Sequence, residues 1–90
     1  MRNVVAAVAI LALPLFAATA AFAGTVSAGN GWSCTAAGIQ NASYRDGRSS
    51  AYIHLSPYAN GKNYPVAVSA DGKTVTGVTT NGTKFTCKKQ

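Results

Sequence analysis

From residue 46 onward, four dipeptides in which Gly follows Asn or Asp divide the chain into short segments. They begin at positions 46, 60, 71 and 81, so that 14, 11 and 10 residues separate successive dipeptides. Asn-Gly and Asp-Gly between β-favouring runs are strong signals for a tight hairpin turn. The runs between them are rich in Val, Thr, Tyr, Phe and Ile, which favour strands, and no run has a helical period. The sequence therefore predicts an all-β fold of short antiparallel strands.

Five strands are expected from these runs and turns. They lie near 31–39, 48–56, 64–70, 73–80 and 83–88, with 40–45 extending the first strand. Residues 24–30 are predicted to be a flexible lead-in. Since there is no helix to cover a sheet, the strands should form a small antiparallel meander, either a partly closed barrel or a two-layer sandwich.

The turn at Asp46-Gly47 predicts which side chains face the core. If this turn has two residues, Ala42 lies opposite Ala51 and Gln40 lies opposite Ile53, and side chains directly opposite share a face. The predicted core face then holds Trp32, Cys34, Ala36, Tyr44, Ala51, Ile53 and Leu55. The predicted outer face holds Ile39, Asn41, Arg45, Arg48, Tyr52 and His54.

The strand pairings predicted by the last two turns conflict with each other. An Asn81-Gly82 turn pairs Val78 with Phe85, and an Asp71-Gly72 turn pairs Val68 with Val75. Because Val75 and Val78 must point to opposite faces of a regular strand, we expect a β-bulge at Gly77 that brings both to the core. The alternative is a sheet that folds over itself there, with both faces partly buried.

The first 23 residues have the features of a secretory signal peptide. Arg2 precedes an apolar run from Val4 to Phe16, and Ala21-Phe22-Ala23 forms an A-x-A cleavage pattern before Gly24. The apolar run is too short to span a membrane comfortably, and no second one follows it. The sequence predicts a secreted or periplasmic protein whose single mature domain is 24–90.

The two cysteines, Cys34 and Cys87, are predicted to form a disulfide. Export places them in an oxidising compartment, where an even number of cysteines favours bridging. A chain this short buries a small core, so a cross-link is a substantial part of its stability. Metal binding is not expected, because His54 is the only histidine available to complete a set of ligands.

Charge and the small number of catalytic side chains argue for a binding protein rather than an enzyme. The chain has a formal net charge of +6, and loss of Arg2 with the signal peptide leaves +5. Asp46 and Asp71 both precede Gly and are expected to bond their own turns, which leaves no carboxylate pair for hydrolysis. With a single His and no recognisable nucleophile motif, neither acid–base nor covalent catalysis is expected, and no cofactor is implied.

Two groups of residues are candidates for binding. Basic and aromatic side chains on one sheet face can hold anionic groups and stack sugars or bases, and the predicted outer face combines Arg45, Arg48, Tyr52 and His54. The second group, Tyr58, Lys62 and Tyr64, surrounds the Asn60-Gly61 turn in the long loop 56–64. An ordinary solvated sheet face and tyrosines that cap the core are the corresponding non-functional interpretations.

The sequence therefore favours a small non-enzymatic binding protein, whose partner is an anionic polysaccharide, a lipid head group or a nucleic acid. The alternative is an inhibitor or toxin-like effector that docks loop 56–64 into a target protein. Lys84, Lys88 and Lys89 are interpreted as lysines that protect an edge strand from pairing with other chains.

Overall fold

The computed structural model describes residues 23–90, which contain strands and turns and no helix. The expected signal peptide lies outside the described residues except for Ala23. The eight strands are β1 (Ala23–Gly29), β2 (Trp32–Ala37), β3 (Ile39–Ser43), β4 (Ser50–Leu55), β5 (Lys62–Pro65), β6 (Ala67–Val68), β7 (Thr74–Val78) and β8 (Lys84–Lys89). The all-β prediction is confirmed.

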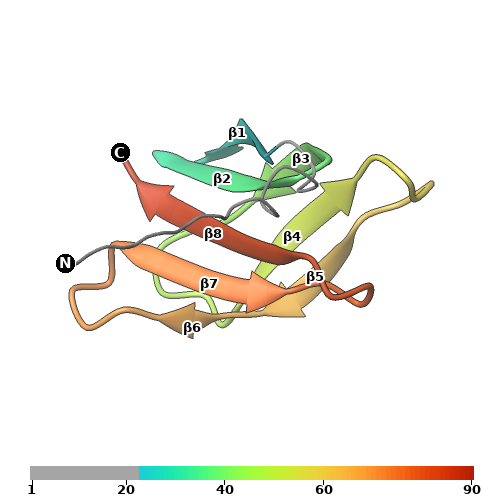
Figure 1. The fold of residues 1–90 in the computed structure, drawn as a ribbon. Helices are drawn as coiled ribbons and strands as arrows, with labels where there is room; N and C mark the ends of the chain where they lie inside the picture. The colour runs from blue at the N-terminus through green and yellow to red at the C-terminus, as the bar shows by residue number, and fades with distance from the viewer. Residues whose placement is uncertain (1–22) are drawn as a thin grey trace, which may run out of the picture.

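The strands form two antiparallel sheets (Figure 1). The larger sheet has the order β1-β2-β8-β7-β6, and the smaller has the order β3-β4-β5. The chain passes between the sheets at two places, Gly38 between β2 and β3 and Val66 between β5 and β6. Gly38 has φ of 70°, a conformation that glycine adopts without the steric cost of a side chain. The single strand predicted over 31–45 is therefore two strands, β2 and β3, and each belongs to a different sheet.

The prediction of a flexible lead-in at 24–30 is wrong. These residues form most of β1, which pairs with β2 from Ala23 opposite Ala37 to Gly29 opposite Trp32. The turn that joins the two strands contains Asn30 at φ 54° and Gly31 at φ 83°. An Asn-Gly turn with positive φ at both residues is the standard two-residue hairpin connection, so Asn30-Gly31 is a turn of the same kind as those predicted from residue 46 onward.

Both sheets contribute to a single core cluster. Ile53 and Leu55 of β4 are buried with Val75 of β7 and Phe85 of β8. The expected core residues Trp32, Cys34, Ala36, Tyr44, Ala51, Ile53 and Leu55 are all buried. The Trp32 and Tyr44 rings meet edge to face with their centroids 4.6 Å apart, a favoured geometry for aromatic pairs.

The Cys34–Cys87 disulfide is confirmed. It joins directly opposite residues of β2 and β8, whose Cα atoms are 3.9 Å apart, and both cysteines are fully buried. The two cysteines fall in the first and last predicted strands, 31–39 and 83–88, but Cys34 belongs to the second strand of the structure because β1 precedes it.

The hairpin around Asp46-Gly47 has the expected faces but a different register. Ala42 pairs with Ile53 rather than Ala51, a shift of two residues that keeps Ala42 on the inward face, whereas Gln40, predicted opposite Ile53, is exposed. The strands separate early because the backbone N–H of Tyr44 donates to the Ala28 carbonyl of β1 instead of continuing the pairing with β4. A bulge between Ile39 and Asn41 then turns Ile39 toward the core, so its predicted outward position is wrong.

The expected bulge at Gly77 is also wrong. β7 pairs with β8 in regular register, with Gly77 opposite Phe85 and Val78 opposite Lys84, and Val78 is half-exposed. A Cβ on Gly77 would lie 2.5 Å from Cζ of Phe85, so glycine is needed there because the buried ring approaches the backbone. The predicted pairing of Val68 with Val75 is confirmed.

Candidate functional site

The two candidate arginines lie at the ends of one β-turn. Arg45 and Arg48 are joined by a hydrogen bond of 3.2 Å from the Arg48 N–H to the Arg45 carbonyl, and Gly47 has φ of 80°. Positive φ at the third residue alone is the signature of a type II turn, which favours glycine there. The turn therefore holds the two Cα atoms close together, and both arginine side chains are exposed.

Tyr44 anchors this turn to the core. Its ring is buried against Trp32, and its hydroxyl donates to the Arg48 carbonyl at 2.7 Å. Asn30 adds a second contact, because its side-chain amide donates to the Tyr44 carbonyl at 3.0 Å. An exposed turn held by partly buried hydrogen bonds presents its side chains from a fixed backbone, which reduces the entropy lost when a ligand binds.

Asp46 lies between the arginines in sequence but has other partners. Its carboxylate accepts a hydrogen bond from Trp32 Nε1 at 2.5 Å and forms an ion pair with Lys89, whose Nζ lies 2.6 Å from Oδ1. The Lys89 hydrogen bond, and then the Trp32 hydrogen bond, hold the pKa of Asp46 below its ordinary value. The expectation that Asp46 bonds its own turn is therefore wrong, because its carboxylate bonds Trp32 and Lys89 instead.

Asp71 behaves as predicted. Its carboxylate accepts hydrogen bonds from the Ser69 hydroxyl at 2.6 Å and from the Lys73 backbone N–H at 3.0 Å, both within its own turn. The Ser69 bond, and then the Lys73 bond, lower its pKa. Within residues 23–90, Asp46–Lys89 is the one ion pair, so neither arginine is neutralised by a carboxylate there.

A polar hollow of about 180 Å³ brings three of the four predicted face residues together. Arg45, Arg48 and Tyr52 line it. Its other lining residues are Asn30, Ser43, Tyr44, Ser50 and Asn63. Ligand pockets for drug-sized molecules are typically larger, roughly 300–1,000 Å³. The hollow is therefore suited to one group of a larger ligand, such as an anionic substituent of a polymer.

Tyr52 and His54 point outward from β4 between the buried residues Ala51, Ile53 and Leu55. The Tyr52 ring lies against Gly61, where a Cβ would be 2.5 Å from both Cζ and Oη of the tyrosine. His54 lies outside the hollow, and its Nε2 is 2.9 Å from the Tyr58 carbonyl. Because a carbonyl only accepts, Nε2 carries the proton in this bond, and His54 fastens the loop after β4.

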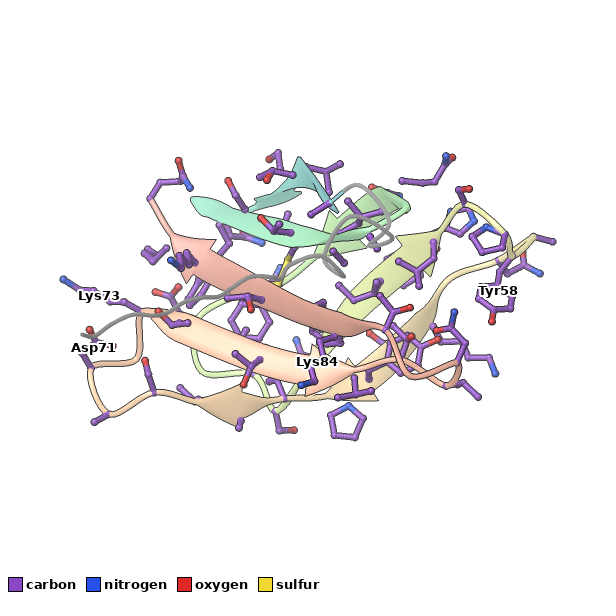
Figure 2. The ribbon with its side chains drawn as sticks, viewed as in Figure 1. Tyr58, Asp71, Lys73 and Lys84 are labelled. Atoms are coloured by element: carbon purple, nitrogen blue, oxygen red, sulfur yellow. A yellow bond between two sulfur atoms is a disulfide. The ribbon has the colours of Figure 1, made fainter. Side chains whose placement is uncertain are left out.

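The second candidate group surrounds a separate hollow. Tyr58, Lys62 and Tyr64 line it together with Asn60, Thr80 and Asn81. Tyr64 lies partly in the core, its ring centroid 6.2 Å from that of Phe85, in agreement with the interpretation of a tyrosine that caps the core. Tyr58 is 45 % exposed and projects from the loop (Figure 2).

Sequence reasoning missed the two asparagines of the first hollow. Asn63 lies opposite Tyr52 in the β4–β5 pairing, and it was overlooked because the strand was expected to begin at residue 64. Asn30 falls in the segment predicted to be flexible, although Asn30-Gly31 is the same turn signal as the later Asn-Gly dipeptides.

Comparison of the chain with models of known protein families, with curated proteins and with solved structures gave no match. Within the described residues, no helix is long and apolar enough to cross a membrane.

Proposed function

We propose that this chain is a secreted or periplasmic, non-enzymatic binding protein, and that the hollow beside the Arg45–Arg48 turn holds an anionic group of a polysaccharide. The juxtaposition of two exposed arginines with Tyr52 around one polar hollow carries the proposal. Guanidinium groups form paired, charge-assisted hydrogen bonds with sulfate, phosphate and carboxylate. Tyr52, Asn30 and Asn63 add an aromatic surface and amides for the neutral part of a sugar.

The state of the titratable groups supports binding rather than catalysis. In the described part of the chain, both carboxylates already bond other side chains or backbone groups, and the His54 Nε2 bonds a backbone carbonyl. General acid–base catalysis needs a side chain that can reach the proton it transfers. The buried disulfide is compatible with an extracellular or periplasmic location.

The proposal is tested by the affinity for dextran sulfate, a sulfated polysaccharide. Replacing both arginines with Ala should weaken binding at least tenfold, because each hydrogen bond to a charged group contributes about 1.5–3 kcal/mol. The matched control is Arg45→Lys with Arg48→Lys, which keeps both charges but removes the paired guanidinium hydrogen bonds and should also weaken binding. An unchanged affinity in this control would show that net charge alone drives binding.

The alternative, a protein inhibitor that inserts loop 56–64 into a target, draws on the exposed Tyr58. A tyrosine buried in a partner contributes through apolar contact, so such binding should change little with salt, whereas polyanion binding weakens steeply. Tyr58→Ala should abolish binding to a protein captured from the native compartment and leave dextran sulfate binding unchanged. A target protein that the Tyr58→Ala variant still captures at high salt would contradict this alternative.

A further inference from the structure

A second basic surface lies on β8. Lys84 and Lys88 are exposed, and they alternate with Phe85 and Cys87, which are buried. β8 is the middle strand of the larger sheet and pairs with β2 on one side and β7 on the other. The interpretation of these lysines as protection for an edge strand is therefore wrong, because this strand has no free edge.

Hydroxyl side chains lie beside Lys88 in register, whereas Lys84 lies opposite the exposed Val78. The strand pairing aligns Thr25, Thr35, Thr86 and Thr76 in one row across β1, β2, β8 and β7. Ser33 and Thr74 lie on either side of Lys88. Hydroxyls both donate and accept hydrogen bonds, which is what the hydroxyls of a sugar require.

Two shallow hollows follow this face. One, of about 360 Å³, includes Thr35, Thr86 and Lys88, and the other, of about 370 Å³, includes Thr76, Thr86 and Lys84. Thr86 belongs to both, so the hollows meet at the centre of β8. Neither is lined by a carboxylate, and Figure 2 shows Lys84 on the side of β7 and β8 that faces the viewer.

The two basic surfaces lie on opposite sides of the molecule. Ile53 of the smaller sheet and Phe85 of the larger sheet belong to one core between the sheets. Tyr52, adjacent to Ile53, therefore points away from the core on one side, and Lys84, adjacent to Phe85, points away on the other. The first surface comprises Arg45, Arg48 and Tyr52, and the second comprises Lys84, Thr86 and Lys88.

We propose that the protein is bivalent and bridges two anionic polysaccharide chains, one on each surface. This inference rests on the proposed function, since the arginine surface is the tighter of its two sites: guanidinium groups form paired hydrogen bonds with an anion, whereas a lysine is a point charge. Charge complementarity supports the second site, because its two lysines have no carboxylate partner in the described part of the chain. A protein with two opposed sites cross-links long chains, whereas a protein with one site only coats them.

The first test is the stoichiometry for a sulfated dextran fragment of about three sugars, measured by calorimetry at low salt. Such a fragment is too short to reach around two sheets packed ~10 Å apart with side chains on both sides. The wild-type protein should bind two fragments. Arg45→Ala/Arg48→Ala and Lys84→Ser/Lys88→Ser should each bind one, and the quadruple variant should bind none. Serine matches the neighbouring hydroxyl side chains, and all four side chains are exposed, so the fold should be retained.

The second test is light scattering with long dextran sulfate. The wild type should cross-link the polymer, and either double variant should bind it without cross-linking. A wild type that binds one fragment, or a Lys84→Ser/Lys88→Ser variant that still cross-links, overturns bivalency and leaves the arginine site standing. If Arg45→Ala/Arg48→Ala changes neither stoichiometry nor cross-linking, the proposed function itself fails.

Discussion

Replacing Gly77 with Ala should destabilise the fold by a specific steric conflict. An ideal Cβ at this position lies 2.5 Å from Phe85 Cζ, 2.8 Å from Phe85 Cε2 and 2.7 Å from the Pro65 carbonyl oxygen. Favourable contacts between carbon atoms lie at about 3.5–4.0 Å, so the ring must retreat by roughly 1 Å. Phe85 is 1 % exposed and packs near Tyr64, so the retreat disturbs a filled core.

The expected loss of unfolding free energy is the difference between two opposing effects. Overpacking a core costs typically 1–3 kcal/mol, whereas Gly→Ala gains about 0.4–1 kcal/mol by restricting the unfolded chain. A net loss of about 1–2 kcal/mol should result. In a domain of this size each kcal/mol corresponds to roughly 4–8 °C in Tm, so Tm should fall by about 5–15 °C.

Thermal and denaturant unfolding, followed by circular dichroism with the disulfide intact, measure this loss. Gly24→Ala is the matched control, because its Cβ would make an ordinary contact 3.6 Å from Ile39 Cγ2. Adding Phe85→Leu to Gly77→Ala should cost less than Phe85→Leu alone costs the wild type, since the smaller side chain relieves the conflict. A Gly77→Ala protein as stable as the Gly24→Ala protein would refute this reasoning.

Three further predictions concern the bridge, the ion pair and the precursor. Replacing Cys34 and Cys87 with Ala should lower the unfolding free energy by about 4 kcal/mol in the chain-entropy model, given their separation of 53 residues, and an unchanged denaturation midpoint would contradict this. Because the folded-state pKa of Asp46 is depressed, its stabilisation is present above the ordinary value of 3.8 and is lost as pH falls through the folded pKa, so Asp46→Asn should flatten the acid side of the Tm–pH curve. An Asp46→Asn Tm–pH curve parallel to that of the wild type would show that the Asp46 carboxylate does not stabilise the fold. The exported protein should begin at Gly24, and an intact mass that retains residues 1–23 would overturn the secretion argument.

The sequence could predict the strands and their faces because alternation and turn chemistry are local. The Ala51, Ile53 and Leu55 pattern identified the core side of β4 even though its pairing with β3 was shifted by two residues. A two-residue shift preserves the alternation of inward and outward side chains, so the predicted core face of β4 was correct although the predicted register was not. The disulfide was predictable because its partners are the only two cysteines.

Apart from β1, whose turn signal Asn30-Gly31 is local, the main errors have causes in other strands. The Tyr44 N–H bonds Ala28, the Asp46 carboxylate bonds Lys89, and the Phe85 ring fills the space above Gly77. None of these contacts has a local pattern. The position of β8 in the middle of a sheet likewise depends on its pairing with β2, more than fifty residues earlier. Because β8 has no free edge, its lysines do not protect one.

The salt dependence of binding to dextran sulfate tests the central claim most directly. The slope of log affinity against log salt concentration reports how many counterions the protein displaces. In Arg45→Ala/Arg48→Ala the slope should become shallower by roughly one unit for each charge lost, whereas Tyr52→Ala should weaken binding with the slope unchanged. An Arg45→Ala/Arg48→Ala protein with the wild-type slope and affinity would show that the anion does not bind beside this turn.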